Sequence, residues 1–174
     1  MAYLENLHAP LPCQYTNLCA VCQAQLRIMK VRYPKPGIVY KGAIPVAEIA
    51  LNTSDKYLTI LISALLGNAY KFTQEGTISL ECDRLGDDRV FVAVADTGCG
   101  IPAEALPHLT EPFYRVDKAR ARANGGSGVG LALCAQIAEA FGTQLTFASR
   151  VGEGTTVTIL LQKEAEHEEA AQQQ

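Results

Sequence analysis

Residues 54–72 read SDKYLTILISALLGNAYKF, and this stretch decides how the chain folds. Its apolar side chains recur at the spacing of one helix face, which predicts a helix over 54–72. Thr53 or Ser54 can cap this helix, and Asp55 suits its positive end. The predicted buried stripe consists of Leu58, Leu61, Ile62, Leu65, Leu66 and Ala69. A neighbouring stripe, expected at the edge of the core, consists of Tyr57, Ala64, Asn68 and Lys71.

The other predicted elements occur in blocks of helices and strands. A helix at 16–32 ends before Pro34 and Pro36, and a strand at 37–41 follows. Further strands are predicted at 77–84, 89–95, 144–149 and 155–161, with a helix at 130–141 that stops at Gly142. Blocks of this kind, without strict β-α alternation, favour an α+β fold in which helices and sheet form a two-layer sandwich.

Length and composition limit what the chain can be. Its 174 residues suffice for one domain, predicted at 16–162 between an irregular segment at 1–15 and a polar, frayed tail at 163–174. The net charge of −3 gives no general attraction to nucleic acid or anionic lipid. The longest apolar-rich run, 58–66, is about half a bilayer span, and the N-terminus lacks the basic start of a signal peptide. We therefore expect a soluble chain that contacts neither nucleic acid nor membrane.

Cysteine spacing gives little sign of a metal site. Among six cysteines, Cys19 and Cys22 form a Cys-x-x-Cys pair, but no second pair or histidine cluster stands at zinc-binding spacing. We therefore predict buried thiols in a reducing compartment rather than zinc binding or redox chemistry.

Asp96 is the first candidate for a chemical role. It ends the apolar strand and is followed by TGCGIP at 97–102. A carboxylate at a strand end beside glycines can face a pocket, and its oxygens only accept hydrogen bonds. It would therefore accept from the exocyclic amine of adenine and disfavour the carbonyl of guanine. The alternatives are a solvated turn carboxylate and an aspartic protease, which needs a second Asp-Thr-Gly that the sequence lacks.

A second candidate is the glycine-rich stretch NGGSGVGL at 124–131, which opens a helix. Glycines let backbone N–H groups approach phosphate oxygens, and a helix N-terminus carries partial positive charge. The stretch is not a P-loop, because no Gly-Lys-Ser/Thr follows it. Basic side chains that suit a phosphate-binding lid precede it: Arg115, Lys118, Arg120 and Arg122. Each of these features alone is also common in an ordinary solvated loop.

The helix at 54–72 adds two candidates on its half-buried edge. Asn68 can give an oxygen to Mg²⁺, and Lys71 can reach a phosphate. An isolated asparagine on a helix is usually structural, so the glycine-rich stretch is what strengthens this interpretation.

The order of these pieces resembles the catalytic domain of sensor histidine kinases in the GHKL superfamily, the Bergerat type of ATP-binding fold. LLGNAYKFT at 65–73 looks like the N box, and DTGCGIP at 96–102 looks like the G1 box. EPFYR at 111–115 looks like the F box, GSGVGLA at 126–132 like the G2 box, and GEGTT at 152–156 like the final hairpin. All five occur in family order, and the resemblance covers residues 45–161.

The resemblance implies a mixed sheet with helices on one face, and ATP and Mg²⁺ as cofactors. Asp96 would bind adenine, Asn68 would bind Mg²⁺, and Phe113 would anchor the lid. The nucleotide-binding set that the resemblance implies is Asn68, Lys71, Asp96, Gly98, Gly100, Ile101, Phe113, Tyr114, Arg115, Arg122, Gly126, Ser127, Gly128, Val129, Gly130, Leu131 and Thr155.

The sequence departs from the family pattern at two points. Ala64 stands four residues before Asn68, where the kinases carry Asn and the superfamily's ATPases carry Glu. Without a carboxylate there, self-contained ATP hydrolysis is disfavoured. His8, His108 and His167 do not fit the phospho-acceptor pattern, so this chain is expected to contain no catalytic phospho-acceptor.

The implied function is that of a protein histidine kinase catalytic domain. It would present Mg-ATP to a histidine on a separate helical-hairpin dimerisation domain of the same parent kinase, with a response regulator downstream. The domain would lie on the cytoplasmic side of a membrane-anchored parent. Alternatives are a GHKL ATPase-type switch, a non-catalytic ATP-binding module, and a related serine or keto-acid dehydrogenase kinase. For the isolated chain we expect nucleotide binding without phosphorylation of its own histidines.

Overall fold

The computed structural model describes residues 11–116 and 128–163. The strands are β1 Gln14–Asn17, β2 Ile38–Ala43, β3 Ala50–Thr53, β4 Gly76–Leu85, β5 Arg89–Asp96, β6 Leu145–Arg150 and β7 Gly154–Gln162. The helices are α1 Leu18–Arg32, α2 Asp55–Phe72, α4 Gly130–Ala140 and a short 3-10 helix, η1 Ala103–His108. Each predicted helix and strand is present, and its ends lie within two residues of the prediction.

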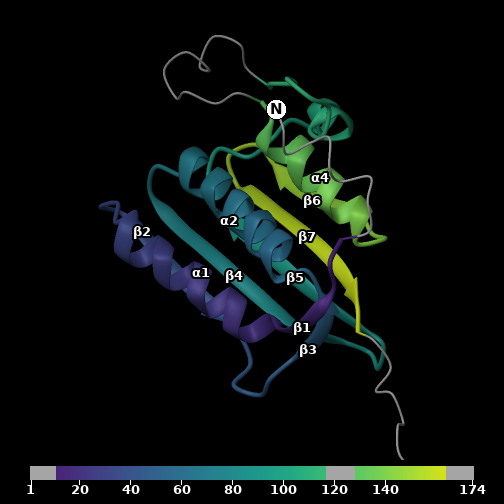
Figure 1. Cartoon of the computed structure of the whole chain (residues 1–174). Helices are drawn as coiled ribbons and strands as arrows, with labels where there is room; N and C mark the ends of the chain where they lie inside the picture. The colour runs from purple at the N-terminus through teal and green to yellow at the C-terminus, as the bar shows by residue number, and fades with distance from the viewer. Residues whose placement is uncertain (1–10, 117–127, 164–174) are drawn as a thin grey trace, which may run out of the picture.

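The main sheet has five strands in the order β2-β4-β5-β7-β6. The strands β2 and β4 are parallel, and the other neighbouring pairs are antiparallel, so the sheet is mixed. The three α-helices cover one face of this sheet (Figure 1). The predicted two-layer α+β sandwich is therefore confirmed.

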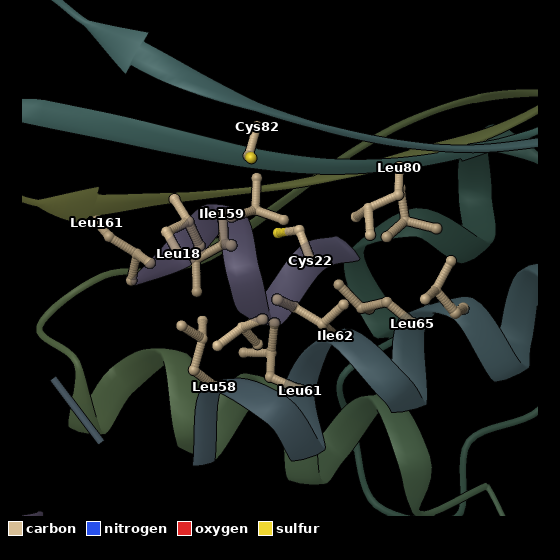
Figure 2. Close-up of a cluster of buried hydrophobic side chains, with 14 of the residues drawn as sticks. Leu18, Cys22, Leu58, Leu61, Ile62, Leu65, Leu80, Cys82, Ile159 and Leu161 are labelled. Atoms are coloured by element: carbon tan, nitrogen blue, oxygen red, sulfur yellow. The ribbon is translucent and has the colours of Figure 1, made fainter. Parts of the chain in front are cut away.

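The core lies between α2, its neighbouring helices and the sheet. All six predicted stripe residues of α2 are buried, and the neighbouring stripe from Tyr57 to Lys71 is half-buried, as predicted. Figure 2 shows Leu61, Ile62 and Leu65 pointing from α2 toward the side chains of α1 and the sheet. Burying one such side chain is worth about 1.5–3 kcal/mol, so this stripe fixes α2 against the sheet.

The N-terminal part of the fold differs from the prediction. The strand β1 begins at Gln14, within the segment 1–15 that was expected to be irregular, and pairs antiparallel with β3. Residues 16–17, predicted as helix, belong to this strand, and Asn17 caps α1 through a hydrogen bond from Ala20 N to Asn17 Oδ1 (3.1 Å). These short strands carry little sequence pattern, because their pairing depends on residues 33 to 39 positions apart.

The start of α2 also differs from the prediction, in how the helix is capped. Ser54 is the N-cap residue, but its side chain makes no capping hydrogen bond. Thr53 lies in β3, where its carbonyl accepts a hydrogen bond from Thr16 Oγ1 (3.2 Å). The helix therefore begins where β3 ends, without the predicted hydroxyl cap.

Candidate functional site

Asp96 ends the central strand β5 and lies opposite Thr155 in the ladder between β5 and β7. Its Oδ1 accepts a hydrogen bond from Gly98 N (2.8 Å). Burial raises the pKa of the Asp96 carboxyl, while hydrogen bonds from the backbone N–H groups of Gly98 and Thr155 act to lower it. The carboxylate is half-buried, oriented by backbone donors, and able to accept a further hydrogen bond.

The turn at 97–101 is wedged between the end of α2 and the β6–β7 turn. Cys99 N donates to Phe72 O (3.3 Å), and Gly152 N donates to Cys99 O (2.8 Å). A side chain at Gly98 would collide with the Phe72 carbonyl, and one at Gly100 would collide with the Arg150 carbonyl. These glycines are therefore needed for close backbone approach, which fixes the position of Asp96.

A serine that the sequence did not single out connects this turn to the sheet. Ser149 Oγ accepts a hydrogen bond from Ile101 N (2.9 Å) and lies 2.8 Å from Thr155 Oγ1. It also donates to Gly154 O (2.8 Å). The predicted residues Ile101 and Thr155 are thus brought together around Ser149, next to Asp96. A single serine in a strand gives no sequence signal of its own. The role of Ser149 is therefore visible only from the register of β6 with β7.

Asn68 and Lys71 lie on the exposed edge of α2, one helical turn apart, and both are half-buried. Asn68 Nδ2 is buried without a hydrogen-bond partner within the part of the chain that the structure describes. Burial lowers the pKa of Lys71, and the positive charge of Arg115 lowers it further. This electrostatic effect indicates that Arg115, the first basic residue of the predicted lid, lies near Lys71.

The predicted F box and G2 box meet through their backbones. Phe113 N donates to Gly128 O (3.1 Å), and a side chain at Gly128 would lie 3.0 Å from the Phe113 Cα. Among the described residues, Phe113 is the one non-glycine with a positive φ, at 67°. This contact is made between described residues on either side of 117–127. The predicted residues Lys118, Arg120, Arg122, Gly126 and Ser127 lie outside the described residues.

His108 and Tyr114 form a small cluster beside this contact. Their ring centroids are 5.4 Å apart, and His108 Nδ1 lies 2.7 Å from Glu111 Oε1. Tyr114 N donates to Glu111 O (3.1 Å). His108 is therefore engaged by the F box rather than presented on a helical hairpin.

The helix α4 begins at Gly130 without a side-chain cap on its first turn. Val129 is the N-cap residue, and its carbonyl accepts from Leu133 N (2.9 Å). The first-turn N–H groups, which include that of Leu131, are thus suited to an anion. The start of α4, the end of α2 and the β6–β7 turn lie at the same end of the sandwich (Figure 1).

These pieces fit a nucleotide. One end of the site offers a fixed carboxylate acceptor, Asp96, and the other offers Lys71 and the uncapped start of α4 for phosphates. The buried, unpartnered Asn68 Nδ2 suits an acceptor such as a phosphate oxygen at the same end, and the side-chain oxygen of Asn68 is a ligand type that Mg²⁺ binds. The amide is compatible with a metal that keeps several waters and binds mainly through substrate phosphates.

Three further observations concern the described residues as a whole. Within 11–116 and 128–163, no group of three or more His, Cys, Asp or Glu side chains is arranged to hold a metal ion. No helix in these ranges is long and apolar enough to cross a bilayer. An open hollow of about 600 Å³, lined by residues that include Lys30, Pro36 and Tyr40, contains none of the predicted site residues.

The cysteines only partly match the prediction of buried thiols. Cys19, Cys22, Cys82 and Cys134 are buried, and burial raises the pKa of Cys134 to about 12. Cys13 and Cys99 are exposed. The prediction is wrong for these two, because Cys13 precedes β1 and Cys99 lies in the turn after Asp96.

The fold and site define the class of α+β domains that bind a nucleotide at one end of a helix-covered mixed sheet. A family model described as "Histidine kinase-, DNA gyrase B-, and HSP90-like ATPase" matches residues 53–165. The chain belongs to this family, which confirms the resemblance found in the sequence.

Named relatives are histidine kinases. The sensor histidine kinase YkoH of Bacillus subtilis (strain 168) is 39% identical over 112 residues, 64% of this chain and 24% of the relative. The histidine protein kinase DivJ of Caulobacter vibrioides is 33% identical over 139 residues, 80% of this chain and 23% of the relative. The chain therefore spans about a quarter of the length of these relatives.

Solved structures share the fold. The crystal structure of full-length ShkA in complex with AMPPNP superposes with a TM-score of 0.79 at 24% identity, over 94% of this chain and 34% of that one. A nucleotide-free catalytic domain of the histidine kinase ThkA gives a TM-score of 0.74 at 19% identity, over 87% of this chain and 95% of that one. The match to ThkA shows that this domain fold occurs in a histidine kinase catalytic domain of nearly the same extent.

Proposed function

We propose that this chain is the ATP-binding catalytic domain of a sensor histidine kinase. It would bind Mg-ATP and present the γ-phosphate to a histidine on a separate helical-hairpin dimerisation domain of the parent kinase. The observation that carries the proposal is that the end of β5, which is Asp96, the end of α2 and the uncapped start of α4 lie at one end of the sandwich. Membership of the ATPase family and the names of the relatives support it.

Adenine would bind beside Asp96. The exocyclic amine donates to the carboxylate, whose position is set by the Gly98 N–H and by the ladder to Thr155. An acceptor-only group disfavours guanine, which presents a carbonyl at that place. The base pocket would therefore favour adenine nucleotides over guanine nucleotides.

The phosphates would bind toward α4 and Lys71. Backbone N–H groups at the start of α4 donate to phosphate oxygens, and the Lys71 ammonium neutralises charge. Bound phosphates would raise the pKa of Lys71 again, because an adjacent anion favours the charged amine. Arg115 and the glycines Gly126 and Gly128 belong to the same proposed phosphate site.

Asn68 would hold Mg²⁺ through its side-chain oxygen. The ion would supply charge neutralisation on the triphosphate when bound. Ala64 faces the same edge of α2 and offers no second polar ligand and no base for water. The chain's own residues thus bind, orient and neutralise the nucleotide, and the nucleophile comes from outside the site.

The proposed partners follow from the absence of a nucleophile among the described residues of the proposed site. The acceptor histidine lies on the dimerisation domain, and a response regulator receives the phosphoryl group downstream. The parent kinase is proposed to be membrane-anchored, with this domain on the cytoplasmic side.

The test has two steps. Calorimetry with a non-hydrolysable ATP analogue should show binding that strengthens with Mg²⁺. Radiolabelled ATP should then label the dimerisation domain of a relative such as DivJ, supplied in trans, while this chain alone stays unlabelled. Steady ATP turnover without a partner would favour the ATPase-type switch. Absence of analogue binding at millimolar concentration would leave only a non-catalytic module.

A further inference from the structure

Thr73 follows the last residue of α2 and is fully buried, with 0% of its surface exposed. Its N–H donates to Ala69 O (3.1 Å), and its carbonyl accepts from Lys35 Nζ (2.7 Å). The Lys35 ammonium also lies 5.2 Å from the centroid of the Tyr70 ring. The backbone of Thr73 is therefore held on both sides by hydrogen bonds that need no ligand.

The Thr73 hydroxyl is a buried polar group that lacks a hydrogen-bond partner among the described residues. Within the described residues, Thr73 Oγ1 has no hydrogen-bond partner of regular length and angle. Hydrogen bonding from this side chain nevertheless acts to lower the pKa of the Asp96 carboxyl, which burial raises. Buried hydroxyls are rarely left unpaired in folded proteins, so the group needs a partner that a small movement or a ligand supplies.

The surroundings of Thr73 leave Asp96 as the partner that the structure offers. The residue before it, Phe72, accepts a hydrogen bond from Cys99 N (3.3 Å), which holds the end of α2 against the turn after Asp96. The close approach at Gly98 keeps this junction free of side-chain bulk. The end of α2, which leads directly into Thr73, is thus held by backbone contacts against the turn that follows Asp96.

We infer that Thr73 is a positioning residue for adenine recognition, whose hydroxyl donates to the Asp96 carboxylate when nucleotide is bound. This inference rests on the proposed function and deepens it. A donated hydrogen bond stabilises the ionised carboxylate, which only accepts. A protonated carboxyl could donate to the carbonyl of guanine, so the hydroxyl that keeps Asp96 ionised also favours adenine over guanine.

Two substitutions separate this role from packing. Thr73→Val replaces the hydroxyl by a methyl group of similar volume, and Thr73→Ser keeps the hydroxyl. Affinities for non-hydrolysable ATP and GTP analogues are measured by calorimetry from mildly acidic to neutral pH. The titration of the Asp96 carboxyl carbon is followed by NMR in the ligand-free proteins.

In Thr73→Val we expect ATP affinity to fall about tenfold, the typical effect of one hydrogen bond to a charged group. The preference for ATP over GTP should narrow, the pKa of Asp96 should rise, and the loss of ATP affinity on acidification should begin at a higher pH. Thr73→Ser should keep the wild-type behaviour. The control Thr146→Val removes a hydroxyl from the exposed edge strand β6, three residues along the ladder from Ser149, and should change none of these quantities.

An unchanged ATP-to-GTP ratio and an unchanged Asp96 titration in Thr73→Val would overturn the inference, whatever happens to stability. Equal losses of ATP and GTP analogue affinity, with an unchanged Asp96 titration, would also overturn the inference. That result would indicate that Thr73 acts through packing alone. If Thr73→Val does not fold, Thr73→Ala gives the same comparison with Thr73→Ser. If the wild-type chain binds neither nucleotide, the proposed function itself fails, which is a distinguishable result.

Discussion

The two halves of the site are built in different ways. The adenine half is part of the sheet: Asp96 lies in the β5–β7 ladder, and the turn after it is held by Phe72, Ser149 and Gly152. The phosphate half is built from helix ends and a chain crossing, where Phe113 N meets Gly128 O. In the proposed site, base recognition would therefore be preorganised by the same contacts that stabilise the fold, whereas phosphate binding would rely on contacts outside the sheet.

The largest expected effect on the adenine half comes from adding a single methyl group at Gly154. Gly154 has a φ of 121°, and a side chain there would collide with the Asp96 carbonyl. Gly154→Ala should lower the free energy of unfolding by about 3 kcal/mol, the sum of backbone strain and overpacking. Urea denaturation measures the change. Gly152→Ala is the matched control, because its φ is 81° but nothing lies within 4 Å of the added carbon. Its cost should be only about 1 kcal/mol, and equal losses in both variants would contradict the close-approach argument.

Replacing the carboxylate should separate recognition from stability. Asp96→Asn should lower ATP affinity by about 10- to 100-fold, as expected for a charged hydrogen bond, because an amide can turn a donor toward the adenine amine. Because burial raises the Asp96 pKa, the folded state favours the protonated carboxyl, and its stabilising contribution is lost as pH rises through that pKa. The variant should thus unfold no more easily than wild type at neutral pH. Asp87→Asn, in the exposed β4–β5 turn, is the control for charge alone.

The pH dependence of wild-type binding has a definite sign. Ionised Asp96 is the form that accepts from adenine, so ATP affinity should fall as pH decreases through its raised pKa. Binding of adenosine, which lacks phosphates, isolates this effect in a calorimetric pH series. A fall that tracks phosphate protonation and is absent with adenosine would show that Asp96 does not set it.

Replacing Lys71 tests the phosphate half of the site separately from the adenine half. Lys71→Met should weaken ATP binding by about tenfold through loss of one charge contact, while adenosine affinity stays unchanged. Lys56→Met, in the first turn of the same helix, is the control, because Lys56 lies at the opposite end of α2. Equal weakening of ATP and adenosine would place Lys71 in the base pocket instead of the phosphate site.

The sequence predicted what depends on local patterns. The stripe on α2 follows from apolar spacing, and Asp96 stood out because it ends an apolar strand before glycines. The Asn68–Lys71 edge followed from the same helical periodicity. These predictions succeeded because a helix face or a strand end is determined by residues within one element.

The parts that were missed depend on contacts between distant residues. Ser149 acts through the register of β6 with β7, and Thr73 through the distance between the end of α2 and the sheet. The pairing of β1 with β3 is equally non-local. A serine in a strand carries no pattern that would single it out, and Thr73, although it ends the N-box stretch 65–73, had no role assigned to it from that stretch.

Phe113 offers the smallest and most specific test of the phosphate half. It combines a positive φ of 67° with a side chain that is 69% exposed, an unfavourable state for an aromatic residue. Phe113→Gly should raise the free energy of unfolding by about 1 kcal/mol at most, because glycine adopts this backbone conformation without strain. If the ring anchors the lid, ATP affinity should fall several-fold and adenosine affinity should not. Phe113→Ala removes the ring but keeps the backbone strain, so it should lose ATP affinity without the gain in stability. A large loss of stability in Phe113→Gly would show that the ring packs within the fold, and the distinction between the two halves would then fail at this residue.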